Sequence, residues 1–202
     1  MRGPATHLAG TKRRFSGQGT GTHLDMRNHH ASESYGFTLI ELLVVIAIIG
    51  ILSTISVVAF ASARAKAKDA AAKADLKQMA TAIQLLSQDT GKWPNGCPIE
   101  SVANPEIYLT AAQAGIASAP APGDQGGGCI WEAADVAKWS GPYATNLNDP
   151  WGHDYYFDPD YVPYQNCGSK TAMPQAPAVV SFGPNGAGPN GYDCDDIFYE
   201  LR

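Results

Sequence analysis

Hydrophobic residues concentrate in one unbroken run in the second quarter of this 202-residue chain. No charged side chain occurs between Leu42 and Ala63, a stretch of 22 residues. About 20 apolar residues are enough for an α-helix to cross a lipid bilayer. The run therefore predicts a membrane-spanning helix over residues 37–63 and disfavours a simple cytosolic protein.

The polar residues that follow alternate with alanines, the strongest helix formers, and no helix breaker separates them from the apolar run. An amphipathic stripe then recurs at helical spacing: Leu76, Met79, Ala80, Ile83 and Leu86. Gly91 and Pro94 mark the expected stop. The pattern predicts one continuous helix from Phe37 to Asp89, about 80 Å long at 1.5 Å per residue, with an amphipathic half over residues 64–90.

Residues 91–202 are typical of a loop-rich head, because they contain 14 glycines and 13 prolines in 112 positions. Three short segments rich in aromatic or β-branched residues are the expected strands: Tyr155–Asp158, Ala178–Phe182 and Ile197–Leu201. Strands this short need another element to pack against, and the apolar stripe of the helix offers one. The predicted fold class is α+β, with a long N-terminal α-helix packed on a small antiparallel β head.

The charges divide unevenly along the chain. Residues 1–36 carry a net charge of +3, whereas residues 91–202 hold 13 acids against 4 bases, a net charge of −9. A dedicated nucleic-acid site is disfavoured, because there is no basic face to neutralise phosphates. Residues 1–25 have no hydrophobic period, so we expect disorder there and predict that translation starts at Met26 rather than Met1.

All four cysteines lie beyond the apolar run: Cys97, Cys129, Cys167 and Cys194. They form no C-x-x-C pair, and His153 is the only histidine after residue 30, which disfavours a zinc site. An even number of cysteines in an exported segment favours two disulfides, for which three pairings are open. We favour Cys97–Cys129 with Cys167–Cys194, since neighbours in sequence close smaller loops. Each bond would contribute roughly 3–4 kcal/mol on the chain-entropy estimate.

The membrane segment contains one ionisable residue, Glu41, four positions after Phe37. A carboxylate in a bilayer helix costs roughly 2.5 kcal/mol or more and so needs a partner. One interpretation is that the free N–H groups and the dipole at the helix start satisfy it. The other requires cleavage between Gly36 and Phe37, which creates an α-amino cation one helical turn from the carboxylate, in the same subunit or in a neighbour.

The segment Gly36-Phe-Thr-Leu-Ile-Glu41, followed by the uninterrupted apolar run, resembles the class III signal of type IV pilins and type II secretion pseudopilins. This resemblance implies that residues 1–36 are a cleaved leader, removed by a prepilin peptidase that cuts after Gly36. It implies that Phe37 becomes N-methylated and that Glu41 recruits the amino terminus of an adjacent subunit during filament growth. The chain departs from many relatives shortly after Gly50, where they have a proline.

An ordinary secretory signal is the main alternative, since Ala61-Ser-Ala63 before Arg64 fits an A-x-A cleavage site. The apolar run is longer than the usual 7–15 residues, and this interpretation leaves the Gly-Phe-x-x-x-Glu spacing without an explanation. Under it, the mature chain is a signal-peptide-cleaved or membrane-anchored extracytoplasmic binding domain.

A second set of candidate residues lies near the C-terminus, where three carboxylates occur within four positions: Asp193, Asp195 and Asp196. A hard divalent cation removes their mutual repulsion, and calcium also accepts the backbone carbonyls that a Gly-rich loop frees. The spacing is not that of an EF-hand. The alternative is a solvated acidic turn.

The flanking motifs resemble the head of the major pseudopilin: Asp149-Pro-Trp-Gly152, Ser181-x-Gly-x-Asn185-Gly and a terminal Asp-Asp196-Ile. That resemblance implies a structural calcium. Its ligands would be carbonyls near Ser181, the side chains of Asn185 and Asp196, and that of Asp193 or Asp195. Relatives usually have aspartate where Asn185 stands, which lowers the affinity expected here.

The expected function is that of a structural subunit of a type IV pilus-like or type II secretion pseudopilus filament. We expect no enzymatic activity, because no nucleophile–base set can be assembled from the chain. The expected partners are other copies of the chain, the prepilin peptidase, an inner-membrane assembly platform and, before assembly, the lipid bilayer. The expected location is the inner membrane, crossed once, and then a periplasmic or cell-surface filament.

Overall fold

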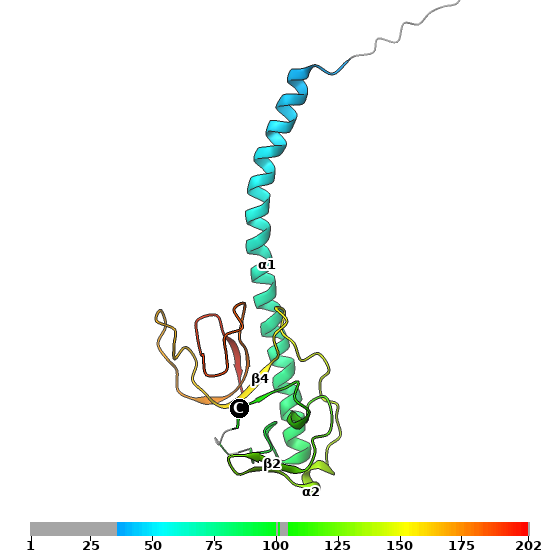
Figure 1. Ribbon diagram of the computed structural model, residues 1–202, viewed down its shortest axis with the longest axis vertical. Helices are drawn as coiled ribbons and strands as arrows, with labels where there is room; N and C mark the ends of the chain where they lie inside the picture. Colours follow the sequence, from blue (N-terminus) through cyan, green and yellow to red (C-terminus); the bar gives the residue numbers. More distant parts are fainter. Residues whose placement is uncertain (1–35, 100, 102–104, 202) are drawn as a thin grey trace, which may run out of the picture. The chain divides into compact units, whose positions relative to one another are not determined.

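The computed structural model describes residues 36–99, 101 and 105–201, and Figure 1 shows their helices and strands. The chain divides into two compact units, with the boundary between Ile46 and Ala47. Apart from Gly36, the expected leader lies outside the described residues, as does the expected start at Met26.

The helix α1 spans Leu39–Thr90 and confirms the prediction of one continuous helix through the apolar and amphipathic segments. It contains no proline, and so every interior residue can donate its backbone N–H to the helix. It ends where the sequence predicts, because Gly91 has a φ of +77°, a conformation that glycine adopts without strain. The N–H of Gly91 donates to the carbonyl of Ser87 at 2.9 Å and completes the C-terminal cap.

The main sheet has four antiparallel strands in the order β1-β4-β5-β6. Their bounds are Ile107–Tyr108 (β1), Tyr156–Tyr161 (β4), Ala176–Ser181 (β5) and Ile197–Glu200 (β6). The three strands expected from the sequence are β4, β5 and β6, which confirms their prediction. In the register, Val179 of β5 lies opposite Phe157 of β4 on one side and Tyr199 of β6 on the other.

Smaller elements lie between β1 and β4 along the chain. They are a 3₁₀ turn at Ala112–Ala114, a hairpin of β2 (Gly123–Gly126) and β3 (Cys129–Trp131), and the short helix α2 (Ala133–Val136). Sequence patterns did not predict β1 or the hairpin, because β1 has two residues and β2, with the sequence Gly-Asp-Gln-Gly, has no apolar alternation.

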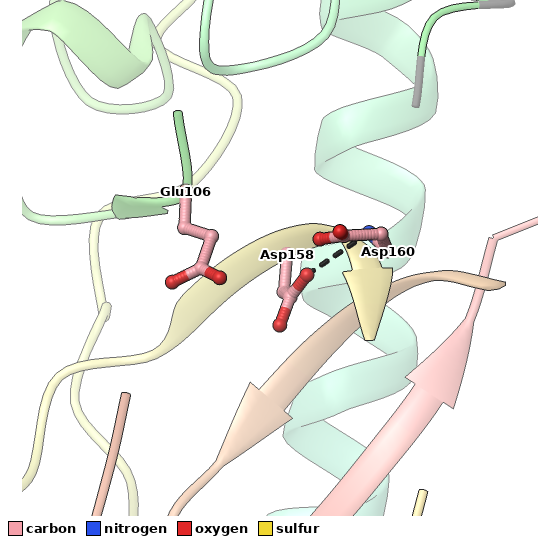
Figure 2. Close-up of side chains that lie close together, drawn as sticks. All are labelled: Glu106, Asp158 and Asp160. Carbon is pink, nitrogen blue, oxygen red and sulfur yellow. Dashed lines mark hydrogen bonds between the residues drawn. The ribbon is translucent and has the colours of Figure 1, made fainter. Parts of the chain in front are cut away.

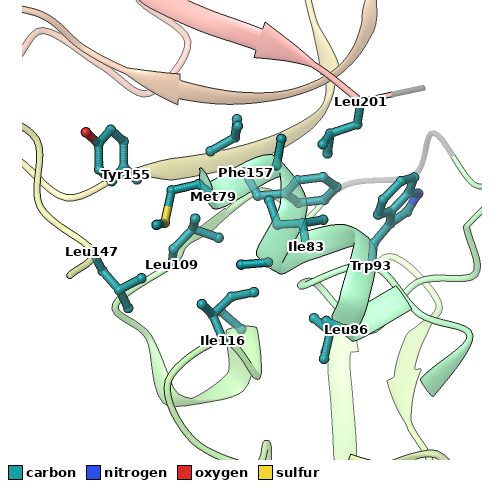
Figure 3. Packing of buried hydrophobic residues seen from close by; sticks show 14 of the residues in the cluster. Met79, Ile83, Leu86, Trp93, Leu109, Ile116, Leu147, Tyr155, Phe157 and Leu201 are labelled. Carbon is teal, nitrogen blue, oxygen red and sulfur yellow. The ribbon is translucent and has the colours of Figure 1, made fainter. Parts of the chain in front are cut away.

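The amphipathic stripe of α1 forms one side of the main core (Figure 3). Leu76, Ile83 and Leu86 are each 1% exposed or less, and they share a cluster with Phe157 of β4 and Val179 of β5. Complete burial of one such side chain contributes about 1.5–3 kcal/mol. The packing of a long helix on an antiparallel sheet confirms the α+β prediction.

The opposite face of the sheet carries a second cluster, which includes Tyr156, Val180 and Tyr192. Side chains alternate between the two faces of a strand, so Tyr156 and Asp158 of β4 lie on this face while Phe157 lies on the helix side. Asp158 is therefore not part of the main core. It is buried on the other face of the sheet, where its carboxylate accepts a hydrogen bond from the hydroxyl of Tyr192 in the C-terminal loop.

Two disulfides staple the head, in the pairing favoured from loop length. Cys97–Cys129 joins the segment after α1 to β3, and Cys167–Cys194 joins the β4–β5 connection to the C-terminal loop.

Candidate functional site

The residues of the signal lie at the start of α1: Gly36 to Thr38 precede the helix, and Glu41 lies in its first turn. Gly36 and Phe37 precede the helix and are exposed, Phe37 by 80%. Thr38 and Glu41 form a reciprocal cap. The Thr38 N–H and Oγ1 donate to Oε2 of Glu41 at 2.9 and 2.7 Å, and Oγ1 accepts the Glu41 N–H at 3.3 Å. The Gly36–Phe37 peptide bond is therefore accessible, next to a carboxylate held one turn into the helix.

The apolar half of α1 exposes its side chains on all sides. Between Phe37 and Phe60, the large hydrophobic side chains that the structure describes are 45–81% exposed, with Val45 and Leu39 at the limits. Among the described residues, α1 is the helix that is long and apolar enough to cross a membrane by length and composition. Such a surface needs lipid or other apolar chains around it.

The structure brings three of the four predicted calcium ligands together in the C-terminal loop. Nδ2 of Asn185 donates to Oδ2 of Asp193 and to Oδ1 of Asp195, both at 2.8 Å. The backbone N–H of Asn185 donates to Oδ2 of Asp195 at 3.2 Å. Burial and the hydrogen bond with Asp193 raise the pKa of Asp195, because the two carboxylates compete for one negative charge. This pair of carboxylates is where a cation would reduce repulsion.

Asp196, the fourth predicted ligand, lies deeper. It is 6% exposed, and its Oδ2 accepts hydrogen bonds from the Tyr161 hydroxyl at 3.0 Å and the Asp193 N–H at 3.1 Å. Its Oδ1 is buried and has no hydrogen-bond partner among the described residues. Burial raises the pKa of Asp196 to about 7. The sequence therefore identified the loop, while the structure gives Asp196 a buried position that the spacing did not indicate.

Two motifs named from the sequence position this loop. Asp149 is buried at the turn before β4, and its Oδ2 accepts the Ser181 hydroxyl at 2.6 Å from the end of β5. Gly183 has a φ of +61°, and a Cβ added there would lie 2.2 Å from the backbone oxygen of Asp195. Only glycine allows this approach, which places Asp195 beside Asn185.

A further carboxylate cluster, which the sequence did not suggest, lies on the sheet face away from α1 (Figure 2). Ligand atoms of Glu106, Asp158 and Asp160 lie within 4.8 Å of one another. The Tyr192 hydroxyl donates to Oδ2 of Asp158 at 2.8 Å, and the Tyr156 hydroxyl donates to Oε2 of Glu106. Burial is the main cause that raises the pKa of Asp158 to about 7.

The Asp-x-Asp pair within β4 is the feature of the sequence that could have pointed to this cluster, because acidic residues are rare in strand interiors. Glu106 is brought in by the pairing of β1 with β4, which links segments distant in sequence.

Comparison with known proteins gives a family for the signal. Residues 32–57 match the family described as the prokaryotic N-terminal methylation motif. This class III signal is a hallmark of type IV pilins and pseudopilins, and it indicates a type IV pilin-like precursor of the kind that a prepilin peptidase processes. The signal and the apolar helix together fit a protein anchored in the inner membrane. No match was found among curated proteins or among solved structures.

Proposed function

We propose that the chain is a structural subunit of a type IV pilus-like or type II secretion pseudopilus filament. One observation carries the proposal: an exposed Gly36–Phe37 bond stands one turn before Glu41, the single charged residue in the exposed apolar half of α1. The mature helices would bundle as the core of the filament, and the acidic heads would coat it.

The chemistry at the helix start follows from hydrolysis of the Gly36–Phe37 bond. Water adds across the peptide bond, so Gly36 leaves with a carboxylate and Phe37 gains an α-amino group that can be methylated. That amine is a cation, and a cation near a carboxylate in an apolar environment is strongly favoured over either charge alone. Both hydrogen bonds from Thr38 reach Oε2 of Glu41, and Oε1 would meet the amine of the neighbouring subunit.

The partners follow from the same surface. Before assembly the exposed apolar side chains of α1 require a bilayer, and after assembly other copies of α1 would replace the lipid. Prepilin peptidase would cut the precursor, and an inner-membrane platform would extract the mature subunit. In the filament the head lies in the periplasm or at the cell surface, where its two disulfides are stable.

A structural calcium in the C-terminal loop is part of the proposal. The available oxygen ligands fit this ion. The Asn185 side chain holds the carboxylates of Asp193 and Asp195 together through hydrogen bonds to both. The buried Oδ1 of Asp196 has no hydrogen-bond partner among the described residues. Bound calcium would replace carboxylate repulsion with shared coordination. We expect the melting temperature of the full chain in detergent to rise with calcium. Asp195→Asn should reduce that rise, and Asn185→Asp should shift it to lower calcium concentrations.

The mature N-terminus tests the filament proposal against its alternative. Mass spectrometry of the protein recovered from membranes should find Phe37, methylated, as the first residue. A mature chain that begins at Arg64 would support an ordinary secretory signal, and an uncut chain would support a membrane-anchored binding domain. Either result would refute the pilin-like assignment.

A further inference from the structure

Three basic residues follow the apolar half of α1 directly: Arg64, Lys66 and Lys68. We call them the basic cluster. All three side chains are exposed, and none of their nitrogens lies within 4 Å of a carboxylate in the described part of the chain. Even when Asp69, the next residue, is counted, the segment carries a net charge of +2. This charge is therefore available to a partner outside the chain.

Membrane topology does not account for the basic cluster. Lys and Arg accumulate on the inner side of membrane proteins, whereas the proposed function puts the head, and with it this cluster, on the outer side. The cations thus stand where the usual charge bias disfavours them, and their presence there has to be explained by an interaction.

The length of the apolar run puts the basic cluster at the headgroup layer of a bilayer. The 22 uncharged residues from Leu42 to Ala63 are about 33 Å long as a helix, which matches a hydrocarbon core about 30 Å thick. The headgroup layer adds about 5–8 Å on each side. At 1.5 Å per residue, Arg64, Lys66 and Lys68 lie about 1.5, 4.5 and 7.5 Å beyond the run, and so within that layer.

Arg64 directs its charge back toward the apolar half of α1. Its guanidinium carbon lies 5.4 Å from the centroid of the Phe60 ring, one helical turn earlier. Val57, Phe60 and Arg64 line one open hollow on the helix surface. Apolar side chains followed by a cation match the acyl chain and the phosphate of a phospholipid. The hollow therefore offers complementary groups to a lipid that lies alongside the helix.

A separate segment of the head reaches the same level. Nζ of Lys68 lies 5.8 Å from the centroid of the Trp151 ring, which belongs to the turn before β4 and is half-buried. Tryptophan is enriched at membrane–water interfaces, because its ring is apolar while its indole N–H is polar. The fold thus brings an interfacial residue from a distant part of the sequence beside the basic cluster.

We propose that Arg64, Lys66 and Lys68 bind anionic phospholipid headgroups, with Trp151 beside Lys68 in the same layer. The proposal rests on the membrane span in the proposed function, and it adds the class of lipid that the subunit prefers. The lipid phosphates neutralise the cations, and the acyl chains contact the apolar side chains below them. The interaction holds the subunit at a fixed depth before assembly.

The test identifies the lipids that remain bound to the full chain. The chain is reconstituted in vesicles of equal parts phosphatidylglycerol and phosphatidylcholine, extracted in mild detergent and analysed by native mass spectrometry. Each Lys or Arg near an anionic surface contributes roughly a fivefold preference, so the three cations should enrich phosphatidylglycerol roughly tenfold or more. Replacing Arg64, Lys66 and Lys68 together by glutamine should reduce the enrichment to less than about twofold.

The matched control removes the same charge elsewhere. It combines Lys73→Gln, Lys77→Gln and Lys138→Gln, three exposed residues outside the headgroup layer. Lys73 lies about 15 Å beyond the apolar run, and Lys77 lies further. Lys138 shares Asp135 with Lys92, which follows the end of α1. This variant should retain the enrichment of the parent.

Equal retention of the two lipids by the parent, or enrichment that survives the glutamine variant of the basic cluster, would overturn the proposal. So would displacement of phosphatidylglycerol by inorganic phosphate, which would indicate a site for free anions. A dimer that forms in the parent without lipid preference and is lost in the variant would instead identify the acidic head of a second copy as the partner, and would also overturn it.

Carbonate extraction of the vesicles separates this result from the proposed function. A chain that stays in the membrane without a lipid preference refutes the lipid surface alone. A chain that carbonate removes refutes the membrane span, and the lipid surface with it. Cleavage at Gly36 is measured independently, so an uncut chain that still enriches phosphatidylglycerol would refute the filament proposal and support this one.

Discussion

The buried carboxylate of Asp149 should be among the most important polar groups for stability of the head. It is 5% exposed, and its Oδ1 accepts the backbone N–H groups of Trp151 and His153, both at 2.9 Å. Its Oδ2 accepts the hydroxyl of Ser181, which is fully buried, at 2.6 Å. Asp149 thus joins the turn before β4 to the end of β5, and through it to the C-terminal loop.

Substitution Asp149→Ala removes the acceptor from three donors at once. An unsatisfied buried donor costs about 1–3 kcal/mol, and two of the three are backbone groups that cannot move far. We therefore expect a loss of about 3–5 kcal/mol in the free energy of unfolding. Asp149→Asn keeps one oxygen for the two backbone donors and should cost about 1–2 kcal/mol, because only the contact with Ser181 must rearrange.

Urea unfolding of the full chain in detergent, followed by tryptophan fluorescence, measures these differences. All four tryptophans lie beyond residue 91, so the signal reports the head. With a slope of about 2 kcal/mol per molar urea, a loss of 4 kcal/mol moves the midpoint by about 2 M. The matched control is Asp124→Ala, which removes an exposed carboxylate that accepts a backbone N–H at 2.8 Å and should shift the midpoint by less than about 0.5 M. If Asp149→Ala shifts the midpoint no further than this control, the reasoning from buried hydrogen bonds is wrong.

Three further predictions address the signal, the disulfide and the pH dependence. Glu41→Gln should leave cleavage and methylation of the N-terminus intact by mass spectrometry but prevent incorporation into filaments, and normal filaments by electron microscopy would contradict the proposed salt bridge. Replacing Cys167 and Cys194 together by serine opens a loop of 27 residues and should cost about 3.5 kcal/mol in urea unfolding, whereas an unchanged midpoint would show that the bond adds no constraint. Hydrogen bonds from Ser140 and then Tyr143 lower the pKa of Asp89 below its ordinary value of 3.8, so this stabilisation is present above pH 3.8 and is lost as the pH falls through the lower folded-state pKa. A Tyr143→Phe variant, which lacks the hydroxyl, should therefore be less stable than the parent at pH 6, and the difference should shrink as the pH falls below 3.8. A difference independent of pH would refute this account.

The local features of the chain followed from sequence because their causes are local. The long helix depends on an uninterrupted pattern without proline and on Gly91 at its end, both visible within a few residues. Strands β4, β5 and β6 were predicted within three residues at each end, since aromatic and β-branched runs bounded by turn residues mark them. The favoured disulfide pairing relied only on loop length, which is also a sequence quantity.

The features that required the structure depend on contacts between distant segments. The two-residue strand β1 exists because β4 offers it a partner, and no pattern of two residues announces that pairing. The buried position of Asp196 depends on Tyr161 of β4, whose hydroxyl donates to Oδ2 of Asp196 at 3.0 Å across 35 positions of the chain.

By itself the sequence determined the processing signal, the apolar helix and the composition of the head, because a cleavage motif and a hydrophobic run act through consecutive residues. Only the tertiary structure decided which carboxylates meet. Glu106 reaches Asp158 and Asp160 through the antiparallel pairing of β1 with β4, and the alternation of β4 puts Asp158 on the face turned from α1. Electrostatic energy depends on distance in space and on burial, and neither quantity can be obtained from positions along a chain until the chain has folded.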